Sequence, residues 1–150
     1  MKVILQKVKK ASVSVDGKIV GEIDKGYCLL VGVHKESTEA DAKYLAKKIV
    51  EARLFEDENE KLNLGLKDVN GSILSVSQFT LYADTKKGKR PSFTNAARAE
   101  EANELYNKFN EYLREEGIKV ETGIFQTMME VNIINDGPVT IIYEKLSLGN

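Results

Sequence analysis

The sequence has little of the side-chain chemistry on which many hydrolases depend. Its 150 residues include one cysteine, Cys28, and one histidine, His34. One cysteine forms no intrachain disulfide, and one cysteine with one histidine cannot make a usual zinc site. A catalytic triad would have to use His34, which we interpret instead as a strand-end residue. Cys28 lies in an apolar run and is expected to be a small buried hydrophobe. We therefore expect no metal and no cofactor.

Long apolar runs and phosphate-binding signatures are also missing. Near the start, only Val3, Ile4 and Leu5 are consecutive apolar residues, too few for a signal-peptide core or a membrane span. We therefore expect a cytoplasmic protein that is not membrane-bound. Neither Gly-x-x-x-x-Gly-Lys-Ser/Thr nor Gly-x-Gly-x-x-Gly occurs, so the sequence gives no support to nucleotide hydrolysis or dinucleotide binding.

The charges nearly balance, because 22 Lys and Arg face 23 Asp and Glu for a formal net charge of −1. Nonspecific affinity for nucleic acid grows with the number of phosphates neutralised, so any RNA contact is expected to be small and local. One dense basic segment contains Lys86, Lys87, Lys89 and Arg90. These cations either meet RNA phosphates or form a solvated loop, and the residues alone leave both open.

The length and the 42% hydrophobic and 30% charged residues suit a single domain over residues 1–150. We predict one helix from a capping box at Thr38 and Asp41 to about Phe55, and a second from about Asn95 to Gly117. Predicted β segments are a hairpin at 16–17, then 27–33, 73–82 and 118–122, and a second hairpin at 135–138 between 128–134 and 139–146. This order predicts an α+β fold, with mostly antiparallel sheets in a barrel-like or layered arrangement and two long helices.

Two polar segments interrupt the β pattern. In 75–81, a regular strand would place Gln78 and Thr80 on one face and Ser77 and Phe79 on the other. This segment is either a half-exposed strand or a strand end whose polar groups converge on a ligand. At 135–138, the Asp-Gly pair explains a turn, and proline is tolerated where a strand begins. The alternative there is a cis Gly137-Pro138 bond with a defined geometric purpose.

Taken together, these segments resemble motifs of the D-aminoacyl-tRNA deacylase family, and the resemblance covers the whole chain. The matches, in order, are Gln6-Lys7-Val8 with Ala11-Ser12-Val13, Ser77-Gln78-Phe79-Thr80, Arg90-Pro91-Ser92-Phe93, Thr122-Gly123-Ile124-Phe125 with Met129, and Asn135-Asp136-Gly137-Pro138. One departure is Leu62, where the family more often has Met. It concerns packing near the pocket and not the reaction.

The resemblance implies the matching fold and a homodimer with a pocket shared between subunits. One subunit would supply Ser77, Gln78, Phe79 and Thr80, and the other Gly137 and Pro138. A cis Gly137-Pro138 bond would aim backbone carbonyls at the substrate α-carbon, so that an L side chain collides and a D side chain points away. Glycine has no side chain to reject, so activity on glycyl-tRNA mischarged on tRNA(Ala) is also implied.

The implied reaction is hydrolysis of the ester between a D-amino acid and the terminal adenosine of tRNA. Backbone N–H groups near Phe79 and Thr80 would stabilise the oxyanion, and the RNA 2′-hydroxyl would activate water. The resemblance places Phe125 and Met129 against the adenine, with core packing as the alternative for each. It leaves the basic loop to meet acceptor-stem phosphates.

Other functions remain open on the residues alone. Thr80 as a covalent nucleophile would need a base within hydrogen-bond reach, such as His34 or a carboxylate. A non-catalytic RNA-binding module would explain the basic loop, but the balanced charge and the lack of an aromatic-rich strand disfavour it. A scaffold protein is the third alternative.

Overall fold

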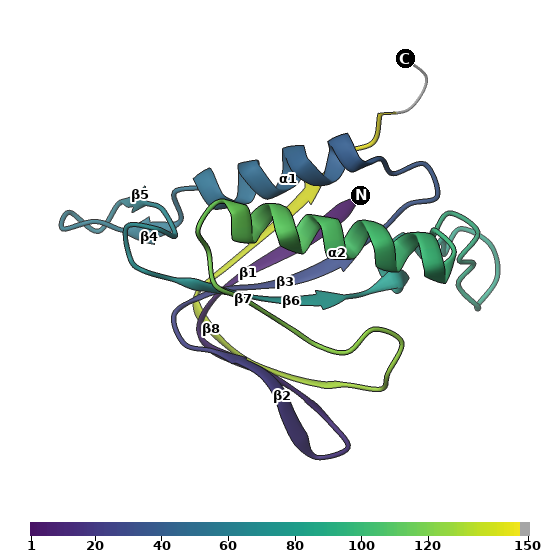
Figure 1. The fold of residues 1–150 in the computed structure, drawn as a ribbon, viewed down its shortest axis with the longest axis horizontal. Coiled ribbons are helices and arrows are strands. Elements are labelled where there is room, and N and C mark those ends of the chain that lie inside the picture. The colour runs from purple at the N-terminus through teal and green to yellow at the C-terminus, as the bar shows by residue number, and fades with distance from the viewer. Residues whose placement is uncertain (148–150) are drawn as a thin grey trace.

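Two helices lie side by side across one face of a strongly bent sheet (Figure 1). The computed structural model describes residues 1–147. The helices are α1 (Glu39–Glu51), α2 (Ala99–Glu115) and a short 3-10 helix, η1 (Phe79–Tyr82). The strands are β1 (Lys2–Val15), β2 (Lys18–Ile23), β3 (Gly26–Gly32), β4 (Phe55–Glu56), β5 (Leu62–Leu64), β6 (Ser72–Ser77), β7 (Val120–Thr122) and β8 (Glu130–Glu144). No helix in the described part of the chain is long and apolar enough to cross a membrane.

Strand β1 organises the sheet. Along one side it pairs with β3 through residues 2–8 and with β2 through residues 11–15, and along the other side it pairs with β8. These three pairings are antiparallel, whereas β6 pairs in parallel with both β3 and β7. A separate antiparallel pair, β4 and β5, stands beside the sheet. The predicted α+β class with mostly antiparallel sheet is therefore confirmed.

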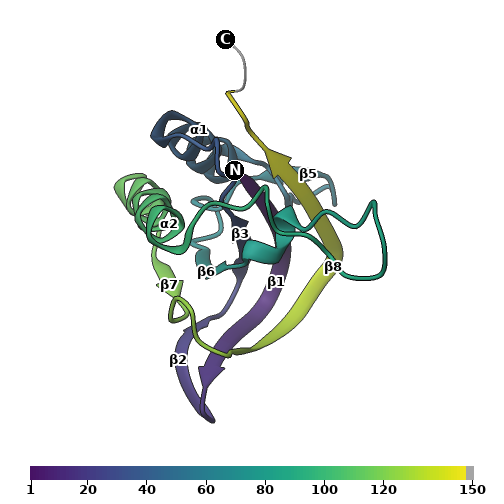
Figure 2. The same ribbon diagram turned by 90° about the vertical axis from the view of Figure 1, so that its right-hand side faces the viewer.

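The sheet bends until its two ends approach each other (Figure 2). Strand β2 comes so close to β7 that a Cβ atom added at Gly21 would lie 2.8 Å from the Thr122 carbonyl oxygen. The absence of a side chain at Gly21 is what permits this approach, because real Cβ atoms do not come so near a backbone oxygen. The result is a nearly closed, barrel-like sheet.

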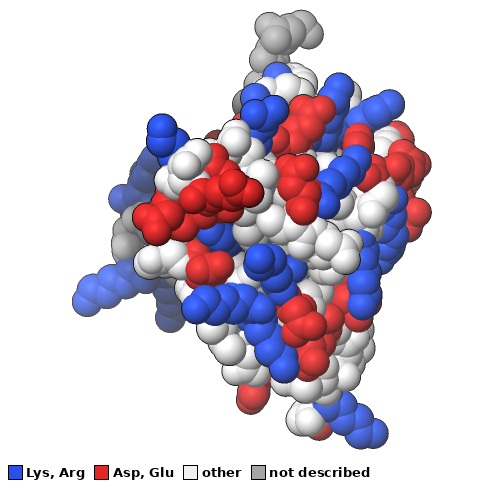
Figure 3. Space-filling model, turned by 90° about the vertical axis from the view of Figure 1, so that its left-hand side faces the viewer, with Lys and Arg blue, Asp and Glu red and all other residues white. Residues whose placement is uncertain are grey.

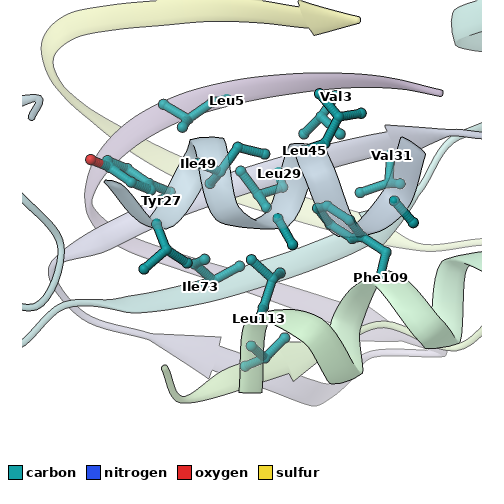
Figure 4. Close-up of a cluster of buried hydrophobic side chains, with 14 of the residues drawn as sticks. Val3, Leu5, Tyr27, Leu29, Val31, Leu45, Ile49, Ile73, Phe109 and Leu113 are labelled. Carbon is teal, nitrogen blue, oxygen red and sulfur yellow. The ribbon is translucent and has the colours of Figure 1, made fainter. Parts of the chain in front are cut away.

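Two apolar clusters fill the two faces of the bent sheet. The larger lies between the sheet and the helices, as Figure 4 shows, and includes Val3, Leu5, Tyr27, Leu29, Val31, Leu45, Ile49, Ile73, Phe109 and Leu113. The smaller lies inside the bend and consists of Val8, Ala11, Val13, Ile23, Cys28, Leu74 and Val76. Each fully buried Leu or Phe contributes about 1.5–3 kcal/mol relative to exposure. The predicted burial of Cys28 is confirmed.

Both long helices are shorter than predicted. The capping box is present, since Thr38 Oγ1 accepts from the Asp41 N–H at 3.2 Å and Asp41 Oδ2 accepts from the Thr38 N–H at 3.0 Å. Helix α1 ends at Glu51, and Phe55 instead begins β4 and stacks on Tyr27. Helix α2 begins only at Ala99, because residues 95–97 pair with 33–35 through backbone hydrogen bonds. Tertiary pairing thus overrides helical periodicity at both boundaries.

Two of the predicted β segments are wrong. The strand predicted for 73–82 stops at Ser77, and the chain turns into η1 two residues later. The hairpin predicted at 135–138 does not form, because 130–144 is one 15-residue strand. Since β1 offers a partner along almost its whole length, both halves of β8 pair with it in the same direction. Shifts of register between Gln6 and Val8 and between Val8 and Lys10 accommodate the residues around Gly137.

Candidate functional site

A hollow of about 490 Å³ opens where the carboxyl ends of the parallel strands β3 and β6 meet the start of α2. This edge of a parallel pair is a common place for ligands. The lining residues are Val33, Val76, Ser77, Gln78, Phe79, Ala97, Ala99, Ala102, Phe125, Gln126, Thr127, Met128, Met129 and Val131. Three of the four residues of the 77–80 motif therefore lie in one hollow with Phe125 and Met129.

The 77–80 motif forms the turn between β6 and η1. The Gln78 N–H donates to the Val31 carbonyl at 2.8 Å, which fixes the end of β6 beside β3. The Gln78 side-chain amide donates to Thr80 Oγ1, so these two side chains bond to each other across a turn and do not share the face of a strand. Among residues 1–147, the N–H groups of Phe79 and Thr80 have no protein acceptor, as is usual at the start of a helical turn. Two donors are thus free beside the hollow.

The loop 123–129 forms the opposite wall. Phe125 stacks on Tyr106 of α2 with ring centroids 6.4 Å apart, and the Thr127 hydroxyl donates to the Ile124 carbonyl at 2.8 Å. Met129 packs against Gly123 and against the smaller apolar cluster. Phe125 and Met129 therefore line the hollow and also pack on the core, while their contact with an adenine stays a prediction.

An exposed apolar rim surrounds the opening. The Phe79 ring is 56% exposed and contacts the Phe93 ring edge-on, with centroids 5.0 Å apart. Met128 is 91% exposed on the other wall. Isolated exposed apolar side chains are ordinary, but several grouped around a hollow are typical of a binding site.

Titratable side chains are absent from the described lining of this hollow. His34 lines a different hollow, of about 190 Å³, between the starts of α1 and α2. Its Nδ1 accepts from the Glu36 N–H at 2.9 Å, and its ring packs edge-on against Tyr82. Burial raises the pKa of the Cys28 thiol to about 12. The larger hollow therefore offers backbone N–H groups, hydroxyls and amides, with no side-chain base among its described lining residues.

The remaining predicted site residues lie elsewhere in the chain. Gly137 and Pro138 are exposed on β8, joined by a cis peptide bond, and do not line the hollow of their own chain. The basic residues Lys86, Lys87, Lys89 and Arg90 are exposed in a loop closed by the Asp84–Ser92 backbone pair. On the side of the molecule opposite this basic loop, acidic and basic side chains are intermingled (Figure 3). No group of three or more His, Cys, Asp or Glu within residues 1–147 is placed to hold a metal ion.

Sequence reasoning missed most of the apolar lining. Ala97, Ala99 and Ala102 border the hollow because small side chains leave space beside the first turn of α2. Alanine in a helix carries no functional signal by itself, since it is also the best helix former. Only the spacing of Ala99 and Ala102 on one face would have indicated a close approach.

Solved structures share this architecture. One, described as c-Myc DNA Unwinding Element Binding Protein, superposes with a TM-score of 0.91 at 39% identity, covering 98% of this chain and 100% of that one. Another, described as a probable eukaryotic D-amino acid tRNA deacylase, has a TM-score of 0.82 at 16% identity, covering 95% and 97%, and shows the fold alone. The fold is thus that of an established structural class.

Sequence comparison identifies the family within that class. The D-aminoacyl-tRNA deacylase of Staphylococcus haemolyticus is 62% identical over 144 residues, covering 96% of this chain and 95% of that protein. The corresponding protein of Exiguobacterium sibiricum is 58% identical over 145 residues, covering 97% and 100%. The sequence model of the D-Tyr-tRNA(Tyr) deacylase family matches residues 4–144. The chain belongs to this family, whose members are hydrolases.

Proposed function

We propose that the chain hydrolyses the ester between a D-amino acid and the terminal adenosine of tRNA, releasing the D-amino acid and tRNA. The observation that carries the proposal is the hollow itself, which unites the 77–80 motif with Phe125 and Met129 in a member of a deacylase family. Charged tRNA is used at the ribosome, so the proposed place of action is the cytoplasm.

In the proposed mechanism, water adds to the ester carbonyl carbon and the carbonyl oxygen becomes an oxyanion. The N–H groups of Phe79 and Thr80 then donate to this oxygen, and each such donor contributes about 3–4 kcal/mol in other hydrolases. The RNA 2′-hydroxyl orients the water and relays a proton, accepting one from the water as it passes its own to the ribose oxygen that carries the amino acid. Collapse breaks the bond to the ribose oxygen, which leaves with a proton as the tRNA hydroxyl. The lining supports this route, because none of its described residues has a titratable side chain that could act as a base.

The opposite wall is proposed to hold the adenine. The Phe125 ring would stack on the base, and Met129 would supply apolar contact, as aromatic and apolar side chains do for unpaired RNA bases. The four cations of the 86–90 segment would meet acceptor-stem phosphates. Their exposure supports this role, and such contacts weaken as salt concentration rises.

We further propose a homodimer in which Gly137 and Pro138 of one subunit complete the hollow of the other. Strand β8 carries many apolar residues, yet none of its 15 residues is buried in the single chain. Ile134 and Ile142 are 56% and 67% exposed. A second subunit would cover this strand and bring the Gly-Pro backbone to the substrate α-carbon, where it would reject L side chains. Glycyl esters would then be substrates as well.

The decisive experiment compares D-tyrosyl-tRNA and L-tyrosyl-tRNA with purified protein. Cleavage of the D ester well above the rate in buffer, with the L ester spared, is the expected result. A rate for both esters equal to that in buffer would contradict the proposal and favour a non-catalytic RNA-binding or scaffold protein. A glycyl-tRNA(Ala) arm tests the predicted tolerance of glycine.

A Thr80→Val variant separates the proposed mechanism from covalent catalysis. Valine has the shape of threonine without the hydroxyl, so backbone donors remain while a nucleophile would be lost. Deacylation within about tenfold of the wild type is expected, because only the bond from Gln78 is removed. Complete loss together with an acyl-enzyme trapped in the wild type would establish Thr80 as the nucleophile.

A further inference from the structure

Tyr106 lies directly behind the proposed adenosine wall without reaching the hollow. It is on α2, one turn after the lining residue Ala102, and only 4% of its surface is exposed. Its ring stacks on Phe125 with centroids 6.4 Å apart and an interplanar angle of 23°. Tyr106 is thus the side chain against which Phe125 rests from the core side.

A hydrogen bond from the Tyr106 hydroxyl fixes the position of the Tyr106 ring. The hydroxyl donates to the Ser75 carbonyl at 2.7 Å. Ser75 is completely buried in β6, between Leu29 of β3 and Thr122 of β7, two residues before the lining residue Ser77. A buried hydrogen bond of this kind is costly to lose, because the carbonyl has no water to replace the donor. One residue therefore connects the strand that ends at the motif with the loop that carries Phe125.

Burial holds the Tyr106 hydroxyl in its protonated, donating form. Burial raises the pKa of Tyr106, and the nearby polar groups of Ser75 and Asn110 offset part of that rise. Asn110 lies one turn further along α2 and is 2% exposed. The Tyr106–Ser75 hydrogen bond thus lies in an otherwise apolar interface, and Asn110 Oδ1 has no hydrogen-bond partner among the described residues.

We propose that Tyr106 is a positioning residue that sets the affinity of the site for the 3′ end of tRNA by holding Phe125 in its stacking position. The inference rests on the proposed function. Phe125 lies in a loop, and without the ring behind it the side chain would have to be ordered by the substrate at each binding event. Ordering one such side chain corresponds to about a fivefold to tenfold loss of affinity.

Four variants test the proposal by their half-saturation concentrations and rate constants for D-tyrosyl-tRNA under single-turnover conditions. Tyr106→Leu removes ring and hydroxyl and is expected to raise half-saturation about fivefold to tenfold with little change in the rate constant. Tyr106→Phe keeps the ring and is expected to restore most of the affinity. Phe125→Ala is expected to weaken binding. Adding Tyr106→Leu to Phe125→Ala is expected to change nothing more, because the supported ring is already gone.

Tyr112→Phe is the matched control. Tyr112 is on the same helix and donates to Glu39 on the α1 side, away from the hollow. The variant removes a tyrosine hydroxyl from α2 and should leave half-saturation and rate unchanged. Thermal unfolding of every variant separates lost fold from lost positioning.

Several outcomes would overturn the role of Tyr106. The first is an unchanged half-saturation concentration in folded Tyr106→Leu, and the second is a change in the rate constant alone. The third is that Tyr106→Leu raises the half-saturation concentration equally in the wild type and in Phe125→Ala. Should Tyr106→Leu not fold, Tyr106→Met replaces it, because methionine fills the volume flexibly without a ring. Wild-type protein that fails to cleave D-tyrosyl-tRNA would instead contradict the proposed function itself.

Discussion

His34, the only histidine in the sequence, has no part in the proposed reaction, because its ring makes local structural contacts. Its ring is engaged by the Glu36 N–H on one side and by the edge of Tyr82 on another. The hollow that it lines adjoins the one that contains the 77–80 motif across Val33 and Ala97, and His34 lines only the smaller of the two. The imidazole therefore has a structural use that needs no reaction to explain it.

The first prediction is that His34→Gln keeps deacylase activity. Glutamine retains a hydrogen-bond acceptor for the 34–37 turn but cannot act as a base at neutral pH. The specificity constant for D-tyrosyl-tRNA is expected to stay within about threefold of the wild type, because the substitution changes only the hydrogen bonding of the 34–37 turn and removes no catalytic group. A loss of several orders of magnitude in folded protein would make His34 the general base.

The second prediction concerns stability and pH. Burial lowers the pKa of His34 below its ordinary 6.5, with further lowering by the positive charges of the Met1 amine and Lys35. As the pH falls below 6.5, the unfolded chain takes up a proton before the folded chain does. The free energy of unfolding is thus expected to fall as the pH drops from 6.5 towards the folded-state pKa. Urea unfolding of wild type and His34→Gln at pH 7.5 and 5.5 measures this, and equal pH dependence in both proteins would refute it.

The third prediction is that Gly137→Ala narrows chiral discrimination. The added Cβ would lie 3.0 Å from Val139 Cγ2 and 3.1 Å from Val139 N, at a φ of +124° that L side chains rarely adopt. The backbone must therefore move by some tenths of an ångström, and with it the groups proposed to reject L side chains. The ratio of D- to L-tyrosyl-tRNA cleavage should fall about tenfold or more. Gly17→Ala, at a φ of +79° in the β1–β2 turn, is the control and should keep the ratio.

Among the elements, β2 shows how one glycine determines the closure of the sheet. The fourth prediction is that Gly21→Ala destabilises the fold by about 1–3 kcal/mol, because the methyl group must displace β7 from its position against β2. Gly65→Ala is the control, since its nearest new contact would be an ordinary 3.5 Å. Urea unfolding of the two variants distinguishes them, and equal stability would mean that the sheet ends separate without cost.

The sequence predicted the elements whose causes are local. The capping box at Thr38 and Asp41 and the hairpin at 16–17 depend on neighbouring residues, and both are present. The ends of the helices and the single strand β8 were missed, because they depend on partners far away in the chain. Residues 95–97 leave the helix to pair with 33–35, and 130–144 remains one strand because β1 supplies a matching partner.

The candidate site was predicted in the same uneven way. The resemblance identified Ser77, Gln78, Phe79, Phe125 and Met129, which the structure brings to one hollow. It gave no indication of the alanines on α2 or of Tyr106, because those residues look like ordinary helix and core positions. Their relevance follows only from what they touch.

For the whole molecule, the exposed apolar surface of β8 leads to the fifth prediction. Ile142→Lys places a charge on a side chain that is 67% exposed, so the single chain should still fold. Burying that charge in an interface is costly, and the variant is expected to be monomeric by light scattering and to lose deacylation in parallel. Ile19→Lys, at a 60% exposed position on β2, is the control. A dimeric variant, or a monomeric one with full activity, would contradict the shared pocket.

The pairing of β1 with β8 brings together the two ends of the described chain, with Lys2 opposite Glu144. During synthesis β1 therefore leaves the ribosome long before β8, the strand that covers its free side. Such long-range pairing slows folding and leaves a strand edge open to other chains in the meantime. Translation that stops before residue 130 would yield fragments in which this edge of β1 is uncovered along residues 2–14. Such fragments are expected to pair with other chains and aggregate, whereas the chain with β8 covers the edge itself.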